Sequence, residues 1–100
     1  MFVNVGRFRF RPMGQDEQQS LLLRIEQDTP PIARESPGFR GVYFARPSDD
    51  ELMTVWLWDS AADWEAALAR FGPFLQQHVV PNLAQPPERV GGEVVLQVMP

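Results

Sequence analysis

Two sets of side chains alternate at the start of the chain. Over residues 2–11 the even positions are mostly aromatic, whereas the odd positions carry valine and then arginine. Alternation with a period of two is typical of a β-strand whose two faces meet different surroundings. We therefore predict a strand that ends before Pro12, with Asn4 on its aromatic face and Arg7 and Arg9 on the opposite face.

The pattern changes to a helical period after Gly14. Apolar residues recur on one side of residues 15–27, and glutamate, glutamine and aspartate fill the other side. We expect this helix to stop near Asp28, because two prolines follow and proline cannot donate the backbone hydrogen bond of a regular helix. Thr29 then caps a short second helical turn that reaches about Glu35.

A second helix is predicted from Ser60 onward. Ser60 and Asp63 resemble a capping box, and apolar residues follow at helical spacing. Gly72 and Pro73 are expected to close this helix. A short separate helical segment then runs from Pro73 to about Val80.

Three further strands complete the pattern. Residues 39–46 and 51–59 are predicted to form a β-hairpin, and a last strand is expected to begin at Val90 or Gly92 and to end at Met99. The order strand, helix, strand, strand, helix, strand predicts an α+β protein, a ferredoxin-like βαββαβ sandwich with an antiparallel four-stranded sheet. Both helices would then pack on one face of the sheet.

The third strand is apolar on both of its faces. Its apolar residues are Leu52, Met53, Val55, Trp56, Leu57 and Trp58. Such a strand must be covered twice, and two helices cover only one face. We therefore predict an isologous homodimer whose sheets pack face to face and bury tryptophans that a monomer would expose. Arg7 and Arg9 are expected to meet Glu51, Glu93 or a carboxylate of the partner there.

Composition narrows the chemistry. The 100 residues are expected to form a single domain over 1–100, and the absence of cysteine excludes disulfides, thiolate metal sites and cysteine nucleophiles. The net charge of -4 argues against nucleic acid and against an anionic membrane surface as partners. The start of the chain lacks the pattern of a secretory signal, and no apolar run is long enough to cross a bilayer, so we expect a cytoplasmic protein.

Two polar residues are candidates for catalysis. Asn4 lies on an otherwise apolar strand face, where its amide either binds a substrate or dioxygen, or is bonded to backbone or water. His78 is the only histidine, and therefore the only side chain whose ordinary pKa lies near neutrality. It is either a reactive group or a partly exposed loop residue.

Aromatic side chains supply the walls of a predicted pocket, although aromatic residues at such spacing usually form a core or an interface. The candidate substrate-binding residues are Phe8, Tyr43, Trp64 and Phe71. An apolar pocket that excludes water, together with a few hydrogen-bonding groups, can stabilise a substrate anion. This set of residues is compatible with such a pocket.

Two motifs, together with the order of the elements, resemble a known family. The motifs are SPGFRG at Ser36–Gly41 and WLWDS at Trp56–Ser60, the latter followed by the helix over Ala61–Arg70. Over essentially its whole length the chain resembles the antibiotic biosynthesis monooxygenase-like domains of the dimeric α+β barrel superfamily. That family includes cofactor-independent oxygenases of polyketide-like aromatics, quinol-oxidising relatives, haem-degrading enzymes and members with no known activity.

The resemblance implies three alternative functions. The first is a cofactor-independent monooxygenase that acts on a small aromatic or quinol-like substrate, with Asn4 and His78 as catalytic residues and no metal. The second is a haem-binding or haem-degrading protein, in which His78 is the axial ligand and Asn4 the distal hydrogen-bonding group. The third is a non-catalytic dimer that binds a small ligand or has a structural role.

Overall fold

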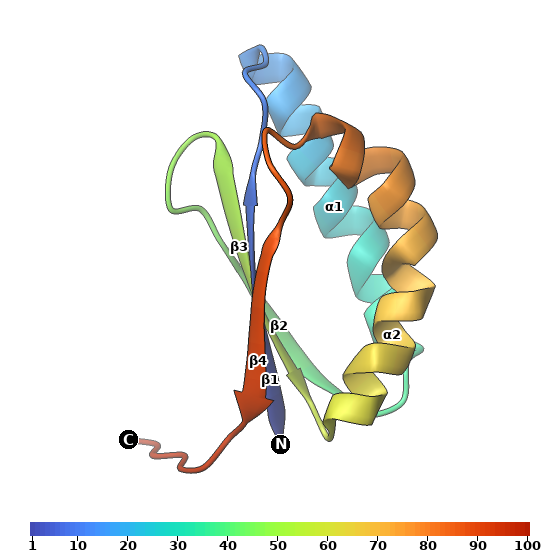
Figure 1. Cartoon of the computed structure of the whole chain (residues 1–100), viewed down its shortest axis with the longest axis vertical. Coiled ribbons are helices and arrows are strands. Elements are labelled where there is room, and N and C mark those ends of the chain that lie inside the picture. The colour runs from blue at the N-terminus through green and yellow to red at the C-terminus, as the bar shows by residue number, and fades with distance from the viewer.

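Strands and helices follow the predicted order. The computed structural model describes residues 1–100, and its main elements are β1 (Phe2–Arg9), α1 (Gln15–Arg34), β2 (Phe39–Ala45), β3 (Glu51–Trp58), α2 (Ala61–Phe74) and β4 (Glu88–Glu93). The strands form one antiparallel sheet in the order β2-β3-β1-β4. Both helices lie on one face of this sheet (Figure 1). The predicted ferredoxin-like βαββαβ sandwich is confirmed.

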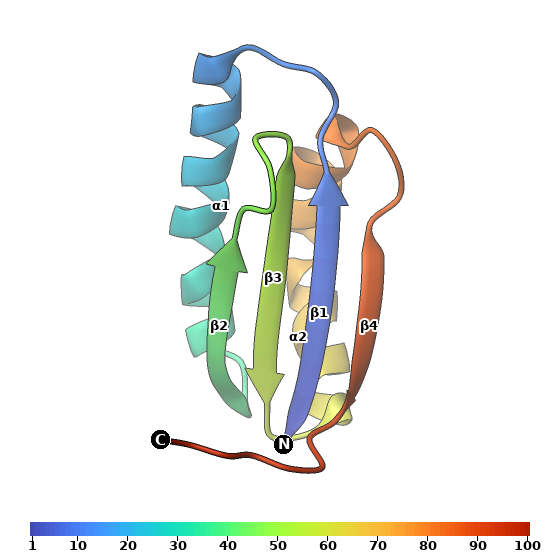
Figure 2. The same ribbon diagram turned by 90° about the vertical axis from the view of Figure 1, so that its left-hand side faces the viewer.

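The central strands β1 and β3 determine which side chains face the helices. They pair in register over their whole length, with Asn4 opposite Trp56 and Phe8 opposite Leu52. Alternation sends these four side chains to the helix-covered face, where all four are buried. The opposite face carries no helix, and Figure 2 views the sheet from that side.

The core consists of two adjoining hydrophobic clusters between sheet and helices. One contains Phe8, Phe10, Leu21, Leu22, Ile25, Leu52 and Val79. The other contains Ala33, Trp56, Trp58, Trp64, Ala67 and Phe71. The partly buried side chains of Phe44 and Leu75 pack against both clusters and so connect them.

The helix α1 is one continuous helix, so the prediction of a stop near Asp28 was wrong. Pro30 and Pro31 lie inside it. Its buried face continues through Ile25, Thr29 and Ala33, at spacings of four residues, and the Thr29 hydroxyl donates a 2.6 Å hydrogen bond to the Ile25 carbonyl. Packing of this stripe against the sheet holds the helical path across the prolines, which local propensity alone disfavours.

The helix α2 begins as predicted but continues further. The Ser60 hydroxyl accepts a 3.1 Å hydrogen bond from the Asp63 backbone N–H, which confirms the predicted cap. Gly72 and Pro73 do not close the helix, contrary to expectation. The chain continues through a π-helical turn at Leu75–Val79 and a 3₁₀ turn, and the wider turn brings Val79 into the core.

The last strand is shorter and earlier than predicted. It runs over Glu88–Glu93, whereas residues 94–100 form no strand. Its side-chain phase is also fixed by pairing with β1, because Arg89 lies opposite Gly6 and Gly91 lies opposite Asn4. Arg89 therefore lies on the helix-covered face of the sheet, on the same side as Asn4.

The tryptophans are covered by the helices and not by a partner, which corrects the expectation that a monomer would expose them. Trp56 and Trp58 are buried on the helix-covered face. The uncovered face instead presents a partly exposed apolar strip, made of Val3, Val5, Met53, Val55 and Leu57. This strip is continuous across the two central strands, so it is the surface that a second copy would cover.

The buried carboxylate of Glu51 binds the charged side chains at one end of the uncovered face. Glu51 accepts a 2.6 Å hydrogen bond from Arg7 Nε and a 3.2 Å one from Arg9 Nη2, and a 3.0 Å bond from the Ser48 hydroxyl. This confirms Glu51 as the predicted partner of the two arginines. The hydrogen bond from Arg7, followed by that from Ser48, lowers the pKa of Glu51 to about 2.

We predict that Glu51→Gln lowers stability at neutral pH and removes part of its acid dependence. Because the pKa of Glu51 falls from 4.5 to about 2 on folding, its ionised form stabilises the fold above its ordinary pKa, and this contribution disappears as the pH falls toward 2. Chemical unfolding at one protein concentration, near neutral pH and at about pH 3, measures the effect. The exposed Glu65→Gln is the control; a pH-independent difference between wild type and Glu51→Gln would contradict the prediction.

Candidate functional site

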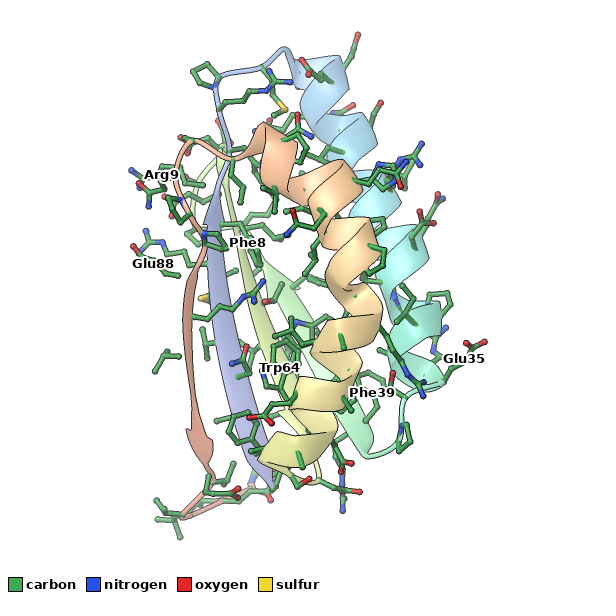
Figure 3. The ribbon with its side chains drawn as sticks, turned by 45° about the vertical axis from the view of Figure 1, so that its right-hand side comes forward. Phe8, Arg9, Glu35, Phe39, Trp64 and Glu88 are labelled. Atoms are coloured by element: carbon green, nitrogen blue, oxygen red, sulfur yellow. The ribbon has the colours of Figure 1, made fainter.

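A cavity lies between the sheet and the two helices. It encloses about 50 Å³ and is lined by fifteen residues, eleven of them hydrophobic. They are Asn4, Phe8, Ile25, Thr29, Phe44, Leu52, Thr54, Trp56, Trp64, Leu68, Phe71, Phe74, Leu75, Val79 and Arg89. Phe8 from β1 and Trp64 from α2 both point into the space between the layers (Figure 3).

One wall of the cavity is aromatic. The ring of Trp56 lies 5.1 Å from that of Phe71, 6.3 Å from that of Trp64 and 6.0 Å from that of Phe44, measured between centroids. Rings at these separations, tilted or edge-on to one another, make favourable contacts. This wall presents flat π-faces and ring edges to any molecule in the cavity, which suits a planar aromatic ligand.

The polar groups of the cavity surround a single glycine. In the sheet register Gly6 lies between Thr54 on β3 and Arg89 on β4, and Asn4 is the next residue on its own strand that faces the same way. A Cβ on Gly6 would lie 2.9 Å from the Thr54 hydroxyl oxygen, a distance that real Cβ contacts do not show. The missing side chain thus leaves room for the Thr54 hydroxyl beside the position of Arg89.

A second glycine makes room for the amide of Asn4. A Cβ on Gly91 would lie 3.0 Å from Asn4 Nδ2 and 2.6 Å from the Phe2 ring. Asn4 is only 6% exposed, and no protein group forms a hydrogen bond with its amide. A buried amide without a protein partner leaves its donors and acceptor available to a molecule in the cavity.

Arg89 is the only charged residue that lines the cavity. It comes from the exposed edge strand β4, and its side chain makes no ion pair or hydrogen bond in the structure. Partial burial lowers the pKa of its guanidinium below the ordinary value. A guanidinium that is partly desolvated and unpaired beside an apolar cavity is a suitable binding group for an anion.

The structure brings four of the six predicted site residues together. Asn4, Phe8, Trp64 and Phe71 all line the cavity. Tyr43 does not, because it lies on the uncovered face of β2 opposite Val55 and is 68% exposed. Strand alternation turns its neighbours toward the helices and Tyr43 away from them.

His78 is also outside the cavity. It belongs to the π-helical turn, and its ring lies 5.0 Å from the ring of Phe74. The predicted second function requires His78 to face an iron atom that shares the cavity with Asn4. The residues present do not fit a haem held in this way, because His78 is not among those that line the cavity.

Sequence reasoning missed Arg89 and Thr54. Alternation along β3 puts Thr54 on the face of Trp56, but nothing in the sequence showed that its hydroxyl meets a cavity. Arg89 was missed because the last strand was expected to begin after it, so its phase was not considered. Pairing of Gly91 with Asn4 fixes that phase, and the pairing is a property of the folded sheet.

Comparisons with known proteins place the fold. No protein-family model matches the chain, and neither does any curated protein. Among solved structures, the monooxygenase of the gene ActVA-Orf6 from Streptomyces coelicolor, in complex with nanaomycin D, is 21% identical at a TM-score of 0.77, over 99% of this chain and 91% of that one. SnoaB from Streptomyces nogalater, a cofactor-independent oxygenase, is 20% identical at a TM-score of 0.73, over 99% and 96%.

A third match is a dimeric ferredoxin-like protein from an uncultured marine organism, 14% identical at a TM-score of 0.72 over 100% of both chains. This chain has the fold of the antibiotic biosynthesis monooxygenases. At identities this low the similarity shows only a shared fold. It does not indicate the substrate, because one fold supports many functions. In addition, no helix of this chain is long and apolar enough to cross a membrane.

We predict that Arg89→Met leaves the stability of the fold unchanged. Arg89 has no partner to lose, so the free energy of unfolding should change by no more than about 0.5 kcal/mol. Phe71→Ala, at the same cavity, serves as the comparison and should cost about 3–5 kcal/mol because Phe71 is buried in the core. Urea unfolding measures both; a loss for Arg89→Met similar to that for Phe71→Ala would mean that Arg89 has a structural role.

Proposed function

We propose that this chain is a cofactor-independent monooxygenase that oxidises a small aromatic or quinol-like substrate in the cavity between helices and sheet. The observation that carries the proposal is the pairing of an aromatic wall with the unpartnered groups of Asn4 and Arg89. The shared fold with a monooxygenase and with a cofactor-independent oxygenase supports it. No step is assigned to Tyr43 or His78.

The polar groups of the cavity would bind the deprotonated, anionic form of the substrate. A phenol or the enol form of an aromatic ketone loses its O–H proton to water at the cavity mouth, and Arg89 stabilises the resulting oxyanion. Asn4 and Thr54 supply neutral hydrogen-bonding groups at neighbouring positions in the register. An electron-rich anion of this kind transfers an electron to dioxygen far more readily than the neutral molecule does.

The overall reaction needs no other reductant when the substrate carries a reactive ring CH₂ group. The CH₂ group supplies four electrons and two hydrogens. One oxygen atom of O₂ becomes the new carbonyl oxygen, and the other leaves as water after an intermediate hydroperoxide loses its O–O bond. The apolar walls exclude water from the anion and the hydroperoxide, which limits side reactions.

The substrate must enlarge the cavity to enter it. A protein cavity of about 150 Å³ is known to bind benzene, whereas this one encloses about 50 Å³. Five lining residues are not buried and are therefore freest to move. Arg89 is exposed, and the partly exposed ones are Phe44, Leu68, Phe74 and Leu75. Arg89 lies on the edge strand β4, which is exposed along its whole length, so we place the entrance beside β4.

We predict that the chain accelerates O₂ uptake by dithranol, a hydroxylated anthrone, and that Arg89→Gln reduces this activity. Loss of one oxyanion-stabilising group should lower kcat by about 10²–10³-fold. An oxygen electrode, with a metal chelator present and spontaneous oxidation subtracted, measures the rate. Arg24→Gln, on the exposed side of α1, is the matched control and should retain full activity.

Binding is measured separately by tryptophan fluorescence. Trp56 and Trp64 line the cavity, so their fluorescence should fall when a quinone product binds. Binding without turnover across a panel of hydroquinones and anthrones would reject the oxygenase and favour a non-catalytic ligand-binding role. Equal rates for Arg89→Gln and wild type would reject the assigned role of Arg89.

A further inference from the structure

The sheet leaves a gap in its helix-facing surface at Gly91. This residue of β4 lies opposite Asn4 on β1, and alternation turns it to the same side as Arg89, two residues earlier. Arg89 has a long side chain there, whereas Gly91 has none. Every residue of β4 is exposed, so whatever separates the Asn4 amide from solvent at Gly91 must come from a neighbouring element.

The ring of Phe2 fills the space that a side chain at position 91 would occupy. A Cβ on Gly91 would lie 2.6 Å from Phe2 Cζ and 3.0 Å from Asn4 Nδ2. The tip of the ring therefore lies over Gly91, next to the amide that lines the cavity. Phe2 does not itself line the cavity and is only partly buried. Its ring thus lies on the outer side of the Asn4 amide.

Phe2 is held less firmly than the aromatic residues deeper in the core. It is the first residue of β1, and strand ends open at lower free energy than strand centres. It makes none of the ring contacts that hold Trp56, Trp58 and Trp64 together. Rotation about its first side-chain torsion would move the ring tip off Gly91 without any movement of the strand.

A phenylalanine packed over an edge glycine can simply stabilise a sheet. Two observations indicate a further role here. Gly91 is bordered by Asn4 and Arg89, the groups that would bind the oxygen atoms of a ligand. In addition, the closed cavity of about 50 Å³ is smaller than one known to bind benzene. Its wall must therefore open, and the side chain over Gly91 is the part beside the polar groups that is free to move.

We propose that Phe2 is the gate of the cavity and that Gly91 provides the gap that this gate closes. When the ring rotates away, a slot opens over Gly91 and leads past the Asn4 amide to the aromatic wall. The inference rests on the proposed function only in taking this cavity as the ligand site. No step of the oxidation is part of it.

The first test measures how fast a thiol inside the cavity is reached from solvent. The chain has no native cysteine, and Thr54→Cys is a conservative change that places a single thiol at the cavity. Exchange of this thiol with dithiodipyridine, a small aromatic disulfide, releases a thiopyridone whose absorbance gives the rate. Adding Phe2→Ala removes the gate and should raise the rate about 10-fold or more.

Phe10→Ala is the matched control for loosening of the fold. It removes the same kind of side chain at the other end of the same alternating pattern, but Phe10 belongs to the other core cluster and is more deeply buried. Labelling that depends on general loosening or unfolding should therefore rise at least as much for Phe10→Ala. A rate for Phe2→Ala that does not exceed the rate for Phe10→Ala would overturn the gate.

The second test refills the slot from β4. In the chain that carries Thr54→Cys and Phe2→Ala, Gly91→Leu places a side chain in the space that the ring has left, so the thiol should react slowly again. Gly92→Leu is its control, because a Cβ on Gly92 meets no atom within 4 Å and alternation turns it to the uncovered face. Equal rates for the two leucine variants would contradict the role of Gly91.

These rates are measured without any substrate, so they separate the gate from the reaction. Fast labelling of Phe2→Ala that Gly91→Leu reverses would support the gate even if the chain did not oxidise dithranol. In that case the oxygenase would be rejected and the gated cavity would remain. Conversely, dithranol oxidation by a chain whose labelling does not respond to Phe2→Ala would keep the oxygenase and reject the gate.

Discussion

The antiparallel pairing of β1 with β3 is the constraint on which the rest of the structure depends. Side chains alternate along a strand, so the register decides which residues face the helices. A slip of one residue would turn Asn4, Gly6 and Phe8 to the uncovered face and drive Arg7 and Arg9 into the apolar core. That cost, together with the burial of Trp56 and Leu52 on the facing strand, makes the observed register strongly preferred.

The same register assembles the polar end of the cavity. Asn4, Thr54 and Arg89 come from three strands and are distant in sequence, yet pairing places them around Gly6. None of these side chains stabilises the fold through a partner inside the protein, whereas the ring contacts of Trp56, Trp64 and Phe71 do. Polar groups that have no partner within the protein, next to a well-packed aromatic wall, are free to pair with a molecule bound in the cavity.

The two faces of the sheet deal with charge differently. On the uncovered face Arg7 and Arg9 are neutralised by Glu51, and the resulting network is complete within one chain. On the helix-covered face Arg89 has no such counter-ion. The uncovered face also retains an apolar strip. Its charged groups are therefore paired, whereas its apolar side chains stay partly exposed. That combination favours contact between proteins over binding of a small charged molecule.

The sequence by itself determined the element order, the faces of β1 and the cap of α2, because each of these follows from residues close together in the chain. Tertiary structure decided the continuity of both helices through their prolines, where packing of Ile25, Thr29, Ala33 and Val79 outweighs local propensity. It also decided that the tryptophans of β3 lie under the helices and that Tyr43 does not. Most importantly, it decided the phase of β4, and hence the placement of Arg89 at the cavity, since strand phase is fixed by hydrogen bonds to a neighbour more than eighty residues away in sequence.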